Sequence, residues 1–125
     1  MRRRLIRGGV LAVLALAALW EPAAARAEDA GRAVFTRQCL ACHSVVRMQN
    51  RVGPSLYGVV GRAAGAVSSY IYSAALRASG LVWTEPVLEA FLADPQALIP
   101  GSAMRYAGLK DAADRAALIA YLKGL

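Results

Sequence analysis

The sequence predicts a small all-α domain, and three observations support this. Apolar residues recur at helical spacing in four segments, no segment alternates apolar and polar residues as a half-buried strand does, and no internal repeat is present. Stretches rich in glycine and proline separate the helical segments. The chain has 125 residues, a length that suits one domain. We therefore expect about four to five helices joined by long loops.

The beginning of the chain is predicted to be an export signal rather than part of the fold. Four of the first seven residues are arginine, an uncharged apolar run follows, and Ala25 and Ala27 frame an A-x-A cleavage motif. An uncleaved membrane anchor needs about 20 apolar residues, and this run ends at Glu21. We therefore predict a secretory signal peptide over 1–27 and a mature domain over 28–125. Twin-arginine export and the general route both remain open.

Removal of this segment changes the charge of the chain. The whole sequence has a formal net charge of +7. Without five arginines and Glu21, ten basic and seven acidic residues remain, an excess of three. This excess is mild, and the chain lacks the dense basic stripe with interleaved aromatic residues that is typical of nucleic-acid binding. The sequence therefore predicts no nucleic-acid partner.

The mature chain begins with a predicted helix and a long loop. The helix starts near Glu28, where acidic residues favour a helix N-terminus, and it leads into Cys39. Residues 44–69 show no clear period and are punctuated by glycine and proline, which predicts an extended loop. Loops of this length are uncommon in compact domains. We therefore expect this loop to wrap a group that is not protein.

Three further helices are predicted in the second half of the chain. Ser73 caps a short helix, and Thr84 caps a second helix that ends at Pro95. The stretch from Pro95 to Asp111 is predicted to be a second loop, because proline and glycine punctuate it. Asp111 caps a final helix with one apolar face.

Both cysteines and the only histidine of the chain fall within five positions, as Cys39, Cys42 and His43. In a helical turn these positions share one face, so two thiols and an imidazole would point at one object. A structural zinc site needs four ligands, and a thioredoxin-like pair is expected beside a βαβ pattern that this chain lacks. A disulfide here would close too small a loop to stabilise the fold. Cys-x-x-Cys-His is the motif of c-type haem attachment, in which the imidazole also binds the iron.

A haem also accounts for the small size of the domain, because a large apolar macrocycle supplies buried surface that 98 residues lack. We therefore predict one haem c, attached covalently through both cysteines. His43 takes one axial position, and the other falls to Met, Lys, water or nothing. Met48 is too close to His43 in sequence to reach the opposite face, whereas Met104 lies in the second loop. We predict Met104 as the second axial ligand, with core filling as the ordinary alternative.

Four stretches of the mature chain, in this order and spacing, carry a specific resemblance: GRAVFTRQCLACHSV, VGPSLYGVVGRAAG, YSAALRASGLVW and, with gaps, IPGSAM.YAGLKD..DRAALIAYLK. They resemble class I c-type cytochromes, the small monohaem cytochromes c of mitochondria and the bacterial periplasm. The resemblance covers essentially all of the mature chain. It implies the cytochrome c fold, a single-electron carrier rather than an enzyme, and first and last helices that cross with Gly31 and Phe35 against Leu118 and Tyr121.

The resemblance also implies roles around the haem. The carbonyl of Pro54 would accept a hydrogen bond from the imidazole of His43 and fix its orientation. Three side chains would bind the haem propionates: Arg62, Tyr72 and Trp83. The ordinary alternative for these three is a surface arginine and two core aromatic residues.

Two positions depart from the family pattern on the side of the haem where Met104 is expected. Phe91 stands where the family usually has a tyrosine whose hydroxyl reaches the methionine sulfur. Leu76 replaces an asparagine that helps to hold a buried water. The sequence therefore predicts a drier pocket in which packing holds Met104. The lost donor lowers the redox potential and the apolar wall raises it, so the two effects oppose each other.

The resemblance implies redox partner proteins and no small-molecule substrate. The expected donor is a dehydrogenase or a bc1-type complex, the expected acceptor is an oxidase or reductase, and the protein is expected to be a periplasmic monomer. Members of the family dock through lysines around the exposed haem edge. Other residues occupy several of these positions here: Gln38, Gln96, Ala97 and Ala103. Because Arg51, Arg105 and Lys110 leave only some positive charge, we expect weak steering towards acidic partners.

A haem enzyme or ligand sensor is the rival function. It would need Met104 to be labile, so that peroxide, NO or CO could reach the iron. The only histidine of the chain is already assigned to the other face of the haem. No second histidine is then available for acid–base work, which favours the electron carrier.

Overall fold

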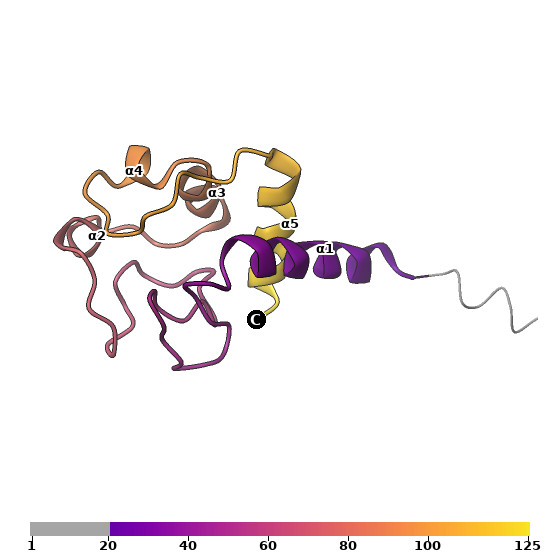
Figure 1. The fold of residues 1–125 in the computed structure, drawn as a ribbon, viewed down its shortest axis with the longest axis horizontal. Coiled ribbons are helices and arrows are strands. Elements are labelled where there is room, and N and C mark those ends of the chain that lie inside the picture. The colour runs from indigo at the N-terminus through magenta and orange to yellow at the C-terminus, as the bar shows by residue number, and fades with distance from the viewer. Residues whose placement is uncertain (1–20) are drawn as a thin grey trace, which may run out of the picture.

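The computed structural model describes residues 21–125, so that most of the predicted signal peptide lies outside the described residues. Over this range the chain forms five helices: α1 (Ala23–Gln38), α2 (Ala74–Ala78), α3 (Glu85–Ala93), α4 (Pro95–Leu98) and α5 (Ala112–Lys123). Long loops separate α1 from α2 and α4 from α5 (Figure 1), whereas Asp94 alone separates α3 from α4. The only β pairing within residues 21–125 is an isolated bridge between Ala63 and Val82. The all-α prediction is confirmed. No helix in the same range has the length and apolar character needed to cross a membrane.

The crossing of α1 and α5 forms one side of the core (Figure 1). A Cβ atom on Gly31 would lie 2.1 Å from the carbonyl oxygen of Ala117 and 2.5 Å from Cβ of Tyr121. The rings of Phe35 and Tyr121 pack with their centroids 5.9 Å apart, and Leu118 is only 1% exposed. The expected crossing is therefore confirmed. Only glycine allows the two backbones to come this close.

The first helix begins earlier than the sequence predicts. α1 starts at Ala23, in an alanine-rich segment upstream of Glu28, because alanine has the highest helix propensity. This end of α1 projects away from the rest of the fold (Figure 1), and residues 21–30 are exposed except for the half-buried Ala25. Cleavage after Ala27 would therefore shorten α1 without removing a buried side chain.

The three predicted helix caps are present. The side chains of Ser73, Thr84 and Asp111 each accept a hydrogen bond from a backbone N–H in the first turn of α2, α3 and α5. These bonds satisfy N–H groups that the first turn of a helix leaves unpaired. The helix starts in the second half of the chain therefore follow from the sequence.

Helix α4 corrects the prediction of an uninterrupted loop after Pro95. The side chain of Asp94 accepts a hydrogen bond from the backbone N–H of Ala97 at 3.1 Å. Pro95 takes the first helical position, where its missing N–H costs nothing. The proline that ends α3 therefore also starts α4, and only Asp94, which is extended, lies between the two helices.

Residues 44–69 form no helix, as predicted, and belong to the first long loop, which runs over 39–73 between α1 and α2 and is held by backbone hydrogen bonds. The N–H of Gly53 donates to the carbonyl of Cys42 at 2.8 Å, and the N–H of Trp83 donates to the carbonyl of Arg62 at 2.8 Å. The loop is thus fixed both to the cysteine motif and to the segment that precedes α3.

Candidate cofactor site

A cavity opens between the first long loop, the segment around Met104, α3 and α5. It encloses about 1010 Å³ of empty space, part of which is open to solvent. Seven of the eight side chains predicted to bind the cofactor line it: Cys39, His43, Pro54, Arg62, Tyr72, Trp83 and Met104. Cys42 is exposed and is not among the lining residues. The fold therefore brings most of the predicted set to one cavity.

The cysteine motif forms a turn after α1 rather than a continuation of the helix. Cys39 is the C-cap residue of α1, and its carbonyl accepts hydrogen bonds from the N–H of Cys42 at 3.0 Å and of His43 at 2.9 Å. This single turn keeps the helical spacing of the motif. Burial, followed by the nearby charge of Cys42, raises the pKa of the Cys39 thiol to about 11. Cys39 is therefore a neutral thiol at the cavity wall.

The imidazole of His43 is held in one orientation. Its Nδ1 lies 2.7 Å from the carbonyl oxygen of Pro54. Since a carbonyl only accepts, Nδ1 carries the proton and donates, which leaves the lone pair on Nε2. Burial lowers the pKa of His43, as does the charge of Arg62, while the hydrogen bond to Pro54 raises it. The net shift is downward, so a neutral imidazole with a metal-binding nitrogen is favoured.

Gly53 allows the imidazole to sit against the backbone. A Cβ atom at this position would lie 2.4 Å from Cε1 of His43. The sequence indicated only a loop at Gly53, whereas the resemblance already implied a role for the carbonyl of Pro54. The structure adds a second reason for glycine, because any side chain would displace the ring.

Arg62 is a half-buried cation with one buried nitrogen that has no hydrogen-bond partner. Its Nη1 and Nη2 donate to the carbonyls of Tyr57 and Ser55, each at 3.0 Å. Its Nε is buried without a hydrogen-bond partner, and burial lowers the pKa of the guanidinium. A buried donor of this kind needs an acceptor, and a carboxylate satisfies it best. The cavity thus fits a group with an apolar body and acidic substituents. A haem, with its apolar ring and two propionates, is such a group.

The two aromatic residues predicted beside Arg62 also line the cavity. The hydroxyl of Tyr72 accepts a hydrogen bond from the N–H of Val67 at 3.3 Å, and its ring packs edge-on against Tyr70 with centroids 4.8 Å apart. Trp83 is buried and packs against Phe91, with centroids also 4.8 Å apart. Both rings are therefore fixed by neighbours. Their role towards propionates stays a prediction.

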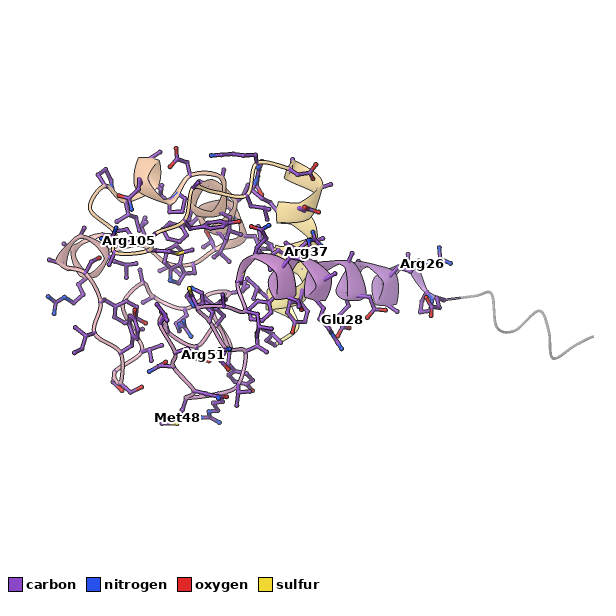
Figure 2. All side chains as sticks on the ribbon, in the orientation of Figure 1. Arg26, Glu28, Arg37, Met48, Arg51 and Arg105 are labelled. Carbon is purple, nitrogen blue, oxygen red and sulfur yellow. The ribbon has the colours of Figure 1, made fainter. Side chains whose placement is uncertain are left out.

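The two methionines of the mature domain have opposite environments. Met48 is 78% exposed, and its side chain lies at the outer edge of the molecule, far from Arg105, which follows Met104 directly in the chain (Figure 2). Met104 is half-buried and lines the cavity that also contains His43. Of these two thioethers, only that of Met104 is placed to act on a group in the cavity.

The zinc alternative finds no support in the described part of the chain. Over residues 21–125, no cluster of three or more Cys, His, Asp or Glu residues could hold a metal ion. A protein zinc site needs three or four such ligands. The side chains placed to act in this cavity are one thiol, one imidazole, one thioether and one guanidinium, from Cys39, His43, Met104 and Arg62.

Comparison with known proteins assigns the chain to a family, because the model for cytochrome c matches residues 28–125. The chain belongs to the cytochrome c family. Among relatives of this cytochrome, cytochrome c2 iso-2 of Magnetospirillum fulvum is 55% identical over 87 residues, which cover 70% of this chain and 91% of the relative. Cytochrome c2 of Blastochloris viridis is 44% identical over 115 residues, which cover 91% and 90% of the two chains.

A solved structure agrees with this assignment. Cytochrome cH from Methylobacterium extorquens superposes with a TM-score of 0.74 at 41% identity, over 78% of this chain and 98% of that one. This cytochrome therefore has the cytochrome c fold. Its family carries electrons by means of a covalently bound haem c, and the protein is an electron-transfer protein rather than an enzyme.

Phe91 provides a test of the drier pocket in this cytochrome. Its buried ring lines the same cavity as Met104. We expect Phe91→Tyr to shift the redox potential by up to about 40 mV. The new hydroxyl would donate a hydrogen bond of about 1 kcal/mol to the thioether of Met104, and for a one-electron couple this energy corresponds to that shift. Redox titration measures the shift. Phe35→Tyr is the matched control at the α1–α5 crossing, and equal potentials for both variants would contradict the placement of Phe91 near Met104.

Proposed function

We propose that this cytochrome is a single-electron carrier with one haem, attached through Cys39 and Cys42 and bound axially by His43 and Met104. The observation that carries the proposal is that Met104 lines the same cavity as Cys39 and His43, although it lies far from both in the sequence. The bound haem supplies an iron that alternates between the ferrous and ferric states. With both axial positions taken by the protein, the chain offers no open coordination site to a substrate.

The residues around His43 support its role as an axial ligand. The hydrogen bond to Pro54 fixes the tautomer, so Nε2 is the nitrogen that faces a metal. The same bond makes the imidazole a more basic ligand. Gly53 leaves room for the ring against the backbone. These contacts would hold the imidazole of His43 in place when the protein gains or loses an electron.

One part of the cavity wall is polar and suits the propionates of a haem, and another part is apolar and suits the body of the ring. The unpaired Nε of Arg62 would donate to a propionate, with Tyr72 and Trp83 as further partners. Leu76 and Phe91 contribute apolar surface elsewhere in the wall. A carboxylate held by Arg62 would orient the ring, and the apolar wall would exclude water from the region of Met104.

We infer export to the periplasm after cleavage behind Ala27. The match to the family model begins at residue 28, the first residue after the predicted cleavage site. No side chain removed by this cleavage among the described residues is buried. The inferred partners are a dehydrogenase or bc1-type complex as electron donor and an oxidase or reductase as acceptor. The protein would carry electrons between them as a monomer.

The axial assignment is tested by removing each thioether in turn. Ferric Met104→Ala is expected to lose the weak far-red sulfur-to-iron absorption band completely, because no other side chain would supply sulfur to the iron. Met48→Ala is the matched control and should keep the band, since Met48 lies at the outer edge of the molecule. Absorption spectra of the ferric variants measure this. Loss of the band in Met48→Ala, or its survival in Met104→Ala, would refute the assignment.

The sparse positive charge of the docking surface predicts a shallow salt dependence. Several positions that carry lysine in the family hold Gln or Ala here, including Ala97 and Ala103, both exposed. The rate of electron transfer to a purified oxidase should fall less than about threefold between 50 and 500 mM salt, because few charges are screened. A variant with Ala97→Lys and Ala103→Lys should fall more steeply in stopped-flow measurements. Equal slopes for the two proteins would contradict this account of docking.

A further inference from the structure

One side chain of α4 is bound to the loop that carries Met104. Gln96 is the second residue of α4, and its Nε2 donates to the carbonyl of Ser102 at 2.8 Å and approaches the carbonyl of Met104 at 3.5 Å. Its Oε1 accepts a hydrogen bond from the N–H of Gly101 at 3.2 Å. A single amide thus contacts three backbone groups within four consecutive residues.

The amide of Gln96 can take only one orientation in this network. The carbonyls of Ser102 and Met104 only accept, so Nε2 must face them. The N–H of Gly101 only donates, so Oε1 must face it. A flipped amide would lose every one of these bonds. The side chain is therefore complementary to this backbone segment.

The backbone around Gln96, at the start of α4, is held in place by its neighbours. Pro95, directly before it, is among the most deeply buried side chains of the described residues, with less than 2% exposure, and its ring restricts φ. Asp94 caps α4 through the N–H of Ala97. Gln96 therefore connects a fixed helix to a loop that contains a left-handed residue, Gly101, with φ of 84°.

We propose that Gln96 is a positioning residue that holds residues 101–104 so that the thioether of Met104 stays directed into the cavity. This inference rests on the proposed function, in which Met104 is the second axial ligand. Gln96 is not among the residues that line the cavity, so it acts through the loop backbone. In the family this position usually carries a lysine that contacts redox partners. In this chain the side chain of Gln96 forms hydrogen bonds to the loop backbone of the same protein.

Gln96→Met tests the proposal, because it keeps the length of the side chain and removes its hydrogen bonds. The probe is cyanide, which competes with Met104 for the ferric iron. We expect cyanide to bind ferric Gln96→Met about tenfold more tightly than the wild type, since the lost bonds no longer oppose opening of the loop. Gln49→Met is the matched control. It loses one hydrogen bond from Ser44 and should bind cyanide as the wild type does.

Amide hydrogen exchange gives a second measurement that does not depend on the haem spectrum. The N–H groups of Ser102 and Tyr106 donate to Ile99 and Met104 within this loop and do not touch Gln96. They should exchange about tenfold faster in Gln96→Met, whereas the amide of Leu118 in the core should not change.

The outcomes separate this inference from the proposed function. If Gln96→Met has the same cyanide affinity and the same loop exchange rates as Gln49→Met, the role of Gln96 is overturned. It is also overturned if the amide of Leu118 exchanges faster in Gln96→Met by the same factor as the loop, because that result indicates general destabilisation. If the wild type has no far-red band and Met104→Ala leaves the spectrum unchanged, the axial assignment itself fails, and the role of Gln96 fails with it. A retained band with tighter cyanide binding supports both.

Discussion

The double variant Cys39→Ala/Cys42→Ala is expected to release all of its haem into acidified organic solvent, whereas the wild type retains one haem per chain. Thioether bonds from Cys39 and Cys42 to the haem would be the only bonds to survive when the fold and the axial ligands are lost. After the haem leaves, the apolar wall of a cavity of about 1010 Å³ loses its packing partner. We therefore also expect the variant to lose cooperative unfolding, measured by circular dichroism during heating.

The single variants are the controls for this experiment. Cys39→Ala and Cys42→Ala each keep one thiol, so each should retain haem through one thioether after extraction. Cys39 lines the cavity, whereas Cys42 is exposed and does not line it, and the test requires that both positions reach the ring. Haem that resists extraction in the double variant, or that escapes from either single variant, would contradict attachment at these two residues.

Gly31→Ala is expected to destabilise the folded protein by about 3 kcal/mol, at the upper end of the usual cost of overpacking. The new methyl group would lie 2.1 Å from the carbonyl oxygen of Ala117 and 2.5 Å from Cβ of Tyr121, and neither atom belongs to a flexible side-chain end. The helices α1 and α5 must therefore move apart. For a domain of this size the melting temperature should fall by roughly 15 °C.

Gly124→Ala provides the matched control for the helix crossing. This glycine has φ of −83°, and an added Cβ would meet only the carbonyl oxygen of Tyr121, at 3.5 Å. Its stability should change by less than about 0.5 kcal/mol. A cost for Gly31→Ala no larger than that for Gly124→Ala, in guanidinium titrations of both variants, would show that the close approach of the helices is not required.

The fold could be predicted from the sequence where local side-chain chemistry determines it. The caps at Ser73, Thr84 and Asp111 are side-chain signals that act over three residues, and the pattern identifies them directly. The sequence prediction was wrong at two places: it began the first helix near Glu28 rather than at Ala23, and it placed a loop where α4 forms. Alanine propensity extends α1 without a cap signal, and Pro95 both ends one helix and starts the next.

The site could be predicted in part for the same reason. Cys39, Cys42 and His43 are rare residue types at a spacing with one main chemical use. Met104 is preferred to Met48 because Met48 is too close to His43 in sequence, and the role of Met104 as axial ligand stays a proposal. The partners of Arg62 could not be predicted, because the carbonyls of the loop that hold it carry no side-chain signal. The role of Gln96 likewise depends on backbone groups that only the folded loop brings together.

The most direct test of the central proposal is the absorption spectrum of the wild-type holoprotein, ferric and ferrous, before and after addition of CO. His43 and Met104 as axial ligands predict a low-spin ferric haem with the far-red sulfur-to-iron band, and a ferrous spectrum that CO leaves unchanged within minutes. A high-spin ferric haem without that band, together with rapid CO binding in the ferrous state, would mean that the sixth position is open. That result would contradict the electron carrier and favour a ligand-binding or peroxidase-like haem protein.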